Sequence, residues 1–241
     1  MMKREAFNIG QMTVSLYGEA AQRAFIFVHG LCGSAEEGLR FAEIVAPHGW
    51  QVLAVNLPEH GGRADGVRLL PWTAIPELQA VLDYAQARWT QLAVRATSIG
   101  AWLSLHAFRG AKLEMCLLNS PLTDMENMIR GMMGQAGVTE DQLRAAGEIP
   151  TEAGQLLSWE YLCWVRRHPV QPICKNTGIL YASGDAVIPR ETVERFSKDG
   201  ACSLTVMNGG EHWFHTPGQL AILAAWEACA LKTWEAAAQQ E

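Results

Sequence analysis

Short apolar runs separated by helical patterns are the feature that most constrains the fold. Each run is nearly continuous and ends in a polar or glycine-rich segment, as strands buried in a parallel sheet do. Strand and helix patterns in alternation predict an α/β protein: a mostly parallel sheet with helices on both faces. The expected strands are 6–9, 12–17, 24–28, 51–55, 92–96, 113–118, 177–182 and 202–207, and the main helices are 35–46, 73–89, 99–108 and 217–237.

One segment interrupts this alternation. Residues 121–172 contain no strand candidate and hold methionine, tryptophan and tyrosine in mostly helical patterns. Because the segment lies between two predicted strands, we expect a helical lid inserted over the carboxyl ends of the strands. The predicted organisation is a core domain of residues 1–120 and 173–241 with a lid insertion at 121–172.

Composition argues against several classes of protein. The formal net charge is −6 without any lysine or arginine cluster, which argues against nucleic acid and anionic membranes as partners. No apolar run reaches the roughly 18 residues of a membrane-spanning helix, and the charged N-terminal segment does not resemble a signal peptide. The six cysteines are scattered without a CxxC pair, so we expect reduced thiols, a cytoplasmic location and no metal or cofactor.

The segment ATSIG, residues 96–100, lies directly between a predicted strand and a predicted helix. A serine at such a sharp turn exposes its hydroxyl above the sheet, and small flanking residues let strand and helix come close. The usual pattern is G-x-S-x-G, and Ala96 takes the place of its first glycine. The alternative is that Ser98 only caps the helix. Pattern and position together favour Ser98 as a nucleophile.

The loop HGLCGS, residues 29–34, follows the strand predicted at 24–28. An acyl-transfer site needs two N–H donors aimed at the developing oxyanion. The donors expected in this arrangement are the amides of Leu31 and of Ile99, the residue after the serine. An ordinary glycine-rich turn is the alternative for this loop. His29 is expected to form structural hydrogen bonds rather than to act as a base.

Two further strand ends supply the other groups of a catalytic triad. Asp185 follows the strand at 177–182, and His212 follows two glycines after the strand at 202–207. Serine is a weak nucleophile that needs a histidine to take its proton and a carboxylate to orient that histidine. The chain order Ser98, Asp185, His212 is the order expected for a triad of this type.

Each of the last two assignments has a rival. His215 lies three residues after His212. We prefer His212 because it follows the glycines with only Glu211 between and precedes an aromatic pair. Asp124 lies shortly after the strand at 113–118, and Asp185 is preferred for its surrounding GDAVIP pattern. Taken alone, an aspartate that follows a strand is more often a turn residue, and a histidine outside any motif is usually structural.

The segments HGLCGS, LPEHGGR, ATSIGAW, GDAVIP and GGEHWF are spread over nearly the whole chain. Together they resemble the α/β-hydrolase superfamily, and its lid-bearing esterase and lipase-like branch more than its peptidase branch. The resemblance implies a serine hydrolase with residues 121–172 as the lid. Two positions depart from the family pattern: Ala96, and Asn56 where many relatives have aspartate. Neither departure removes a catalytic group.

This resemblance leads us to expect hydrolysis of a small hydrophobic acyl or aryl ester through an acyl-enzyme. The partner is then a small-molecule ester, and a homodimer is possible. Aromatic, sulfur and apolar side chains near the motifs or in the lid are candidates for the substrate pocket, although those of the lid could equally form its packing. The pocket candidates are Cys32, Met125, Trp159, Trp164 and Trp213.

Other functions remain open on the same scaffold. They include thioesterase, acyltransferase, C–C hydrolase and cofactor-free haloperoxidase activity, and outside catalysis a hydrolase-like fold that only binds a ligand. A dehalogenase or an epoxide hydrolase would need a carboxylate at position 98. A dinucleotide-binding protein would need G-x-G-x-x-G after the first buried strand, and residues 29–34 do not fit that pattern.

Overall fold

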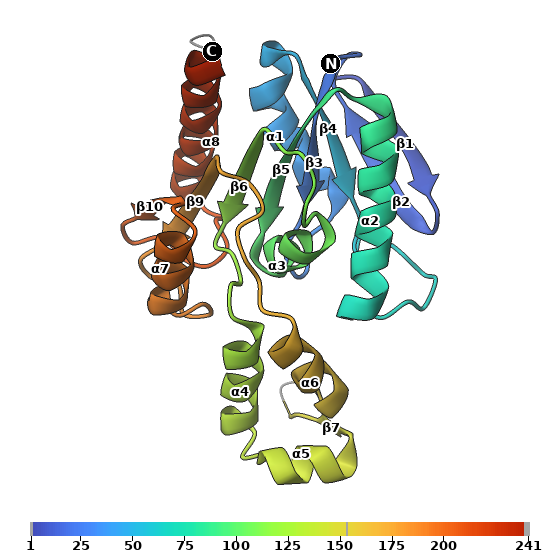
Figure 1. Cartoon of the computed structure of the whole chain (residues 1–241), viewed down its shortest axis with the longest axis vertical. Helices are drawn as coiled ribbons and strands as arrows, with labels where there is room; N and C mark the ends of the chain where they lie inside the picture. Colours follow the sequence, from blue (N-terminus) through green and yellow to red (C-terminus); the bar gives the residue numbers. More distant parts are fainter. Residues whose placement is uncertain (1, 153, 239–241) are drawn as a thin grey trace. The chain divides into compact units, whose positions relative to one another are not determined.

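The computed structural model describes residues 2–152 and 154–238 (Figure 1). Its central sheet has eight strands in the order β1-β2-β4-β3-β5-β6-β9-β10. The strand β2 runs antiparallel to β1 and β4, and all other neighbours pair in parallel. The strands are β1 (Arg4–Ile9), β2 (Met12–Tyr17), β3 (Arg23–Val28), β4 (Trp50–Val55), β5 (Gln91–Thr97), β6 (Met115–Asn119), β9 (Thr177–Ala182) and β10 (Ser203–Met207).

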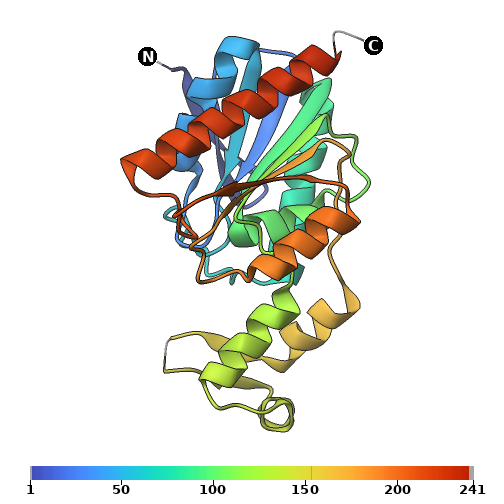
Figure 2. The ribbon, with the colours of Figure 1, turned by 90° about the vertical axis from the view of Figure 1, so that its left-hand side faces the viewer.

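Helices cover both faces of this sheet. The helices α1 (Gly38–Val45) and α8 (Pro217–Ala238) pack together on one face, and α2 (Pro71–Arg88) and α3 (Ser98–Ala107) on the other (Figures 1 and 2). The remaining helix of the sheet region is α7 (Arg190–Asp199), which contacts β10. Two short 3-10 turns, Ala35–Glu37 and Ala46–His48, flank α1. The predicted class, a mostly parallel sheet with helices on both faces, is confirmed.

Aromatic side chains form much of the core between the sheet and α1. The ring of Phe25 meets Phe41 edge-on at 4.9 Å between centroids and Trp50 at 4.7 Å. Leu231 of α8 is fully buried in the same cluster. Burying a large aromatic side chain contributes on the order of 2 kcal/mol or more to folding, so this cluster anchors both helices. None of the helices in the described ranges has the length and apolar composition to cross a membrane.

Two parts of the sequence prediction were wrong or incomplete. Residues 121–172 were expected to contain no strand, yet β7 (Glu148–Pro150) and β8 (Leu156–Ser158) form an antiparallel hairpin. Strands of three residues are too short to show an alternating pattern. The helix α7 was not predicted, although Val193 and Phe196 are buried at a spacing of one helical turn. Its sequence is mostly charged, which hid this narrow apolar stripe.

The chain divides into two compact units. One comprises Met1–Leu122 and Gln171–Glu241, and the other comprises Thr123–Val170. The second unit contains α4 (Met125–Gln135), α5 (Glu140–Ala146), the hairpin and α6 (Trp159–Arg167). Its helices share buried apolar residues, and the Arg166 guanidinium donates to the carboxylates of Glu126 and Glu140. The residues buried in this unit include Ile129, Met133, Leu143, Leu157, Leu162 and Val165.

A buried ion pair connects β5 to α8. Nε of Arg95 donates to Oε1 of Glu227 at 2.8 Å, and the two side chains are 6% and 3% exposed. The guanidinium also donates to Oγ1 of Thr97 and lies over the ring of Phe27. Burial raises the pKa of Glu227, while Arg95 opposes that rise. Each of the two buried charges is therefore compensated only while its partner is present.

Breaking this pair is expected to destabilise the fold. Glu227→Leu leaves the Arg95 charge buried without its partner, which should lower the free energy of unfolding by about 3–5 kcal/mol. The double variant Arg95→Met/Glu227→Leu should recover most of that loss. Urea denaturation of the three proteins measures both effects. Removing the exposed pair Arg190–Glu194 serves as the control and should cost less than about 1 kcal/mol. A double variant as unstable as Glu227→Leu would contradict the prediction.

Candidate active site

Ser98 lies at the sharp turn between β5 and α3. Its φ angle is +50°, a left-handed conformation that costs a residue with a β-carbon roughly 1–2 kcal/mol. The helix begins so close to the sheet that a β-carbon on Gly100 would lie 2.1 Å from the carbonyl oxygen of His29. Glycine is therefore required at position 100, whereas Ala96 is accommodated as a fully buried residue. Strain at Ser98 lifts its hydroxyl out of the strand direction.

Two hydrogen bonds link Ser98, His212 and Asp185. Oγ of Ser98 lies 2.9 Å from Nε2 of His212, and Nδ1 of His212 lies 2.7 Å from Oδ2 of Asp185. A carboxylate can only accept, so Nδ1 carries the ring proton and Nε2 accepts from the serine hydroxyl. The Asp185 side chain is fully buried, and its Oδ1 accepts from the amides of Val187 and Ile188 at 2.8 Å each. The carboxylate is thus held in one orientation.

The loops that carry Asp185 and His212 are joined to each other. The amide of Gly184 donates to the carbonyl of Gly210 at 2.9 Å, and the amide of Gly209 donates to Oγ of Ser183 at 2.8 Å. A β-carbon on Gly184 would lie 2.7 Å from the Gly210 oxygen, so only glycine allows this approach. Small residues in both loops therefore bring Asp185 and His212 within hydrogen-bonding distance.

Hydrogen bonds of two histidines, His29 and His60, fix the loop at 29–34. Nδ1 of His29 donates to the carbonyl of Gly30, and its Nε2 accepts from the amide of Leu57. Nδ1 of His60 donates to the carbonyl of Pro58, and its Nε2 accepts from the amide of Cys32 at 2.9 Å. Both imidazoles use both nitrogens in the neutral form. This arrangement agrees with the structural role expected for His29.

The two expected oxyanion donors belong to the loop at 29–34 and to the start of α3. Leu31 follows Gly30 in the loop and is 65% exposed. Ile99 is the second residue of α3, and the first amides of a helix have no partner within that helix. Its N–H and the positive end of the helix dipole are available to a negative charge beside Ser98.

The stability of the protein is expected to depend on His29 at acid pH. Burial lowers the pKa of His29 from 6.5 to about 4, with a further contribution from the nearby His60. The unfolded chain therefore binds a proton between about pH 6.5 and pH 4 that the folded protein does not. The contribution of His29 to the free energy of unfolding is therefore fully present above pH 6.5. It is lost as the pH falls towards 4, which lowers the free energy of unfolding by about 3 kcal/mol.

Urea denaturation of wild type and His29→Gln between pH 7.5 and pH 4 measures this contribution. The free energy of unfolding should fall more steeply in wild type than in the variant, because the variant lacks the titrating group. The exposed His168→Gln serves as the matched control and should keep the wild-type slope. Equal slopes in wild type and His29→Gln would contradict the assignment.

His215 and Asp124, the alternatives to His212 and Asp185, contact other groups. His215 is exposed, and its Nδ1 lies 3.0 Å from the carbonyl of Trp213 and 3.4 Å from a carboxylate oxygen of Glu211. The Asp124 carboxylate accepts from the amide of Asn127 and caps the start of α4. Within the described ranges, no group of three or more histidine, cysteine or acidic residues could hold a metal ion.

The expected pocket residues fall in both units. Cys32 and Trp213 belong to the first unit, and both are exposed. The other three belong to the second unit, where each has a defined environment. Met125 is buried, Trp159 lies under the guanidinium of Arg144, and Trp164 stacks on His168 at 4.1 Å.

Sequence reasoning missed the residues that hold the loop after β4. Oδ1 of Asn56 accepts from the amide of Ala35 at 2.8 Å, directly behind the loop at 29–34. The Arg63 side chain is almost fully buried and donates to Asp65, to Glu77 and to the carbonyl of Asn56. The segment LPEHGGR was recognised only as part of a resemblance. The charged and polar residues of this segment, directly after a buried strand, are the signal that could have indicated their supporting role.

Comparison with known proteins agrees with this architecture. No family model and no curated protein sequence matches the chain, but solved structures match nearly all of it. Est1E from Butyrivibrio proteoclasticus aligns at a TM-score of 0.76 and 18% identity, covering 97% of this chain and 99% of that one. For mouse alpha/beta hydrolase domain-containing protein 10 the TM-score is 0.72 at 14% identity, with 96% and 99% covered.

A third structure is an α/β serine hydrolase from Xanthomonas campestris that is described as lacking a lid. It aligns at a TM-score of 0.65 and 16% identity, and covers 97% of this chain and 94% of its own length. Likeness at such identities establishes the fold alone. The protein has the α/β-hydrolase fold.

Proposed function

We propose that the protein is a serine hydrolase that cleaves carboxylic esters through an acyl-enzyme. The observation that carries this proposal is the chain of hydrogen bonds from Ser98 through His212 to Asp185. A serine in this setting can lose its proton to the histidine as it attacks, and the buried carboxylate stabilises the imidazolium that forms. No metal or organic cofactor is needed for this chemistry.

The reaction proceeds in two halves. Oγ of Ser98 bonds to the ester carbonyl carbon, its proton passes to Nε2 of His212, and the carbonyl oxygen becomes an oxyanion facing the amides of Leu31 and Ile99. The bond to the alcohol then breaks, and the leaving oxygen takes the proton from Nε2. Water attacks the acyl-enzyme with His212 again as base, which releases the acid and restores the serine.

We propose a small hydrophobic acyl or aryl ester as the substrate. Trp213 follows the base directly and is 67% exposed, so an aromatic surface is available beside the triad. A structure of Est1E is described with ferulic acid bound, and that ligand is an aromatic acid. An aryl group stacking on an exposed indole gains both buried apolar area and ring contacts.

Hydrolysis of short-chain p-nitrophenyl esters, combined with labelling by a fluorophosphonate, tests the proposed function. Turnover should begin with a burst of p-nitrophenol if deacylation is slow, and one phosphonyl group per chain should map to the peptide containing Ser98. A folded protein that neither hydrolyses any ester of a panel nor reacts with the fluorophosphonate would support a ligand-binding role instead.

We further propose that the unit formed by residues 123–170 selects among acyl groups. It is inserted between β6 and β9, and it carries the partly exposed Trp159 and Trp164. Replacing either tryptophan by alanine removes exposed apolar area from this unit. If the unit selects acyl groups, kcat/KM for p-nitrophenyl octanoate should fall by about tenfold and that for the acetate ester should stay nearly unchanged. Leu156→Ala, exposed in the same unit, is the control. Equal losses on both esters would contradict selection by this unit.

A further inference from the structure

The loop that carries Leu31 contains a tight turn with an unusual third residue. The amide of Gly33 donates to the carbonyl of Gly30 at 3.1 Å, so residues 30–33 form a β-turn. At the third position of this turn, Cys32 has a φ angle of +63°, as in a type II turn. Glycine or asparagine is usual there, because a β-carbon in the left-handed region costs roughly 1–2 kcal/mol. The turn therefore needs a contact that offsets this cost.

His60 supplies such a contact from the loop after β4. Its Nε2 accepts from the amide of Cys32 at 2.9 Å, and its Nδ1 lies 2.7 Å from the carbonyl oxygen of Pro58, to which it donates. In the common type I turn the third residue has a negative φ angle, and the peptide between the second and third residues is flipped. A flipped peptide would turn the N–H of Cys32 away from Nε2. The hydrogen bond from Cys32 to His60 therefore favours the type II form.

Leu31 lies between two peptide planes, and different histidines hold them. The carbonyl of Gly30 accepts from Nδ1 of His29 at 2.7 Å and from the amide of Gly33, which fixes the plane before Leu31. The bond to His60 fixes the plane after Leu31. Because Leu31 is 65% exposed, packing of its side chain contributes little. The position of its amide therefore depends on both hydrogen bonds.

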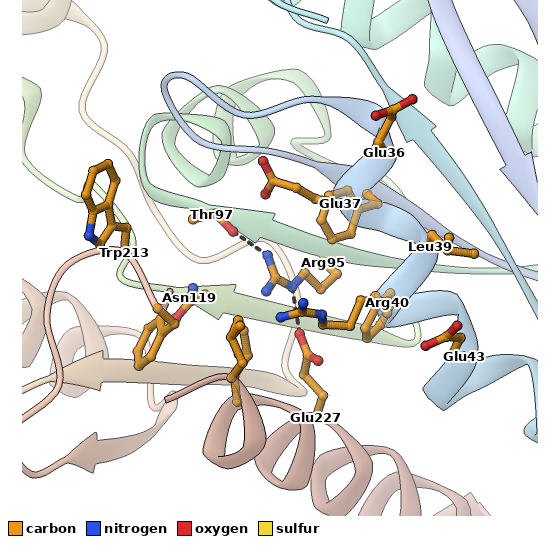
Figure 3. Close-up of a pocket in the computed structure, with 15 residues that line it drawn as sticks. Glu36, Glu37, Leu39, Arg40, Glu43, Arg95, Thr97, Asn119, Trp213 and Glu227 are labelled. Atoms are coloured by element: carbon orange, nitrogen blue, oxygen red, sulfur yellow. Dashed lines mark hydrogen bonds and ion pairs between the residues drawn. The ribbon is translucent and has the colours of Figure 1, made fainter. Parts of the chain in front are cut away.

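The same bond decides which amide of the turn is available to an oxyanion. The N–H of Cys32 is used by His60, whereas no hydrogen bond joins the amide of Leu31 to any residue in the ranges 2–152 and 154–238. The end of the loop is fixed separately. Oε1 of Glu37, which Figure 3 shows in the wall of a cavity beside α1, accepts from the amide of Ser34 at 3.1 Å.

We propose that His60 is a positioning residue for acyl transfer, because its Nε2 holds the turn in the form from which the amide of Leu31 donates to the oxyanion. This inference rests on the proposed ester hydrolysis. In this role His60 neither binds the substrate nor transfers a proton. Both halves of the reaction pass through an oxyanion, so loss of the contact slows both halves. The bound ester carries no such charge, so kcat falls and KM stays nearly unchanged.

Two substitutions separate the two hydrogen bonds of His60. The amide of glutamine extends as far from the β-carbon as Nε2, and the amide of asparagine extends as far as Nδ1. His60→Gln therefore keeps an acceptor for the amide of Cys32 and loses the bond to Pro58. His60→Asn keeps the bond to Pro58 and leaves the amide of Cys32 without its acceptor. Each variant loses one hydrogen bond, so their melting temperatures should be similar.

Steady-state hydrolysis of p-nitrophenyl butyrate by the full chain tests the proposal. His60→Asn should lower kcat by about tenfold or more and keep KM within about twofold, because removal of a whole oxyanion donor costs about a hundred- to a thousandfold. His60→Gln should restore kcat to within about threefold of wild type. A folded His60→Asn with the wild-type kcat, or equal losses of kcat in both variants, would overturn the proposal.

Inhibition by butylboronic acid gives the second readout. This acid forms a tetrahedral adduct with a serine hydroxyl and so imitates the transition state. Its inhibition constant should rise in His60→Asn by about the factor by which kcat falls, and an unchanged constant would overturn the proposal. A wild-type protein that hydrolyses no ester of a panel would overturn the proposed function and this role together. An active wild type with an unimpaired His60→Asn would overturn only the role of His60.

Discussion

Ser98→Ala is expected to lower kcat for p-nitrophenyl butyrate by roughly a million-fold. Loss of the nucleophile removes the acyl-enzyme route entirely, and His212 and Asp185 have no independent use without it. A residual rate above that of water should remain, because the substitution leaves the proposed oxyanion donors, the amides of Leu31 and Ile99, in place. Steady-state rates corrected for traces of contaminating esterase measure the effect.

Two controls separate chemistry from folding. Ser203→Ala makes the same substitution at an exposed position of β10 and should keep the wild-type rate. Thermal unfolding of Ser98→Ala should occur near the wild-type temperature, since alanine keeps the β-carbon that strains this turn. A folded Ser98→Ala that still turns over the ester at a rate near wild type would exclude Ser98 as the nucleophile.

The order of the strands explains why much of the fold could be predicted. Each apolar run that ends in a motif is a strand of the parallel part of the sheet, and parallel strands bring their carboxyl ends to one edge. This rule alone suggested that Ser98 and His212, 114 residues apart in sequence, could meet, and the structure places them 2.9 Å apart. Local sequence could not supply the distance itself, since it depends on the contacts between Gly184 and Gly210.

The features that sequence reasoning missed depend on contacts between distant residues. Arg95 is a charge within an apolar strand, and Glu227 is a charge within an apolar helix. Each looked like an isolated exception, and only the packing of α8 on the sheet makes them partners. The buried Oδ1 of Asn119, which has no hydrogen-bond partner among the described residues, is likewise invisible in sequence, because an asparagine at a strand end is ordinary. Opposite charges in two buried elements are the pattern that could have indicated the pair.

Asp185→Asn is expected to lower kcat by about ten-thousand-fold, whereas Asp124→Asn should change it by less than a few-fold. Asparagine at 185 can offer its amide to Nδ1 of His212, which favours the tautomer whose Nε2 carries the proton and cannot accept it from Ser98. It also leaves the imidazolium without a compensating charge. Oδ1 of Asp124 accepts from the amide of Asn127 in a helix cap, and an asparagine oxygen can accept the same bond.

The pH dependence of the two variants sharpens this comparison. Hydroxide can take the serine proton in place of the misoriented imidazole, so raising the pH should recover part of the rate of Asp185→Asn. Asp124→Asn should keep the wild-type profile, and matched melting temperatures would exclude unfolding as the cause. The reverse pattern, with the large loss in Asp124→Asn, would move the orienting carboxylate to the residues after β6. Position 185 would then contribute only through its hydrogen bonds to Val187 and Ile188.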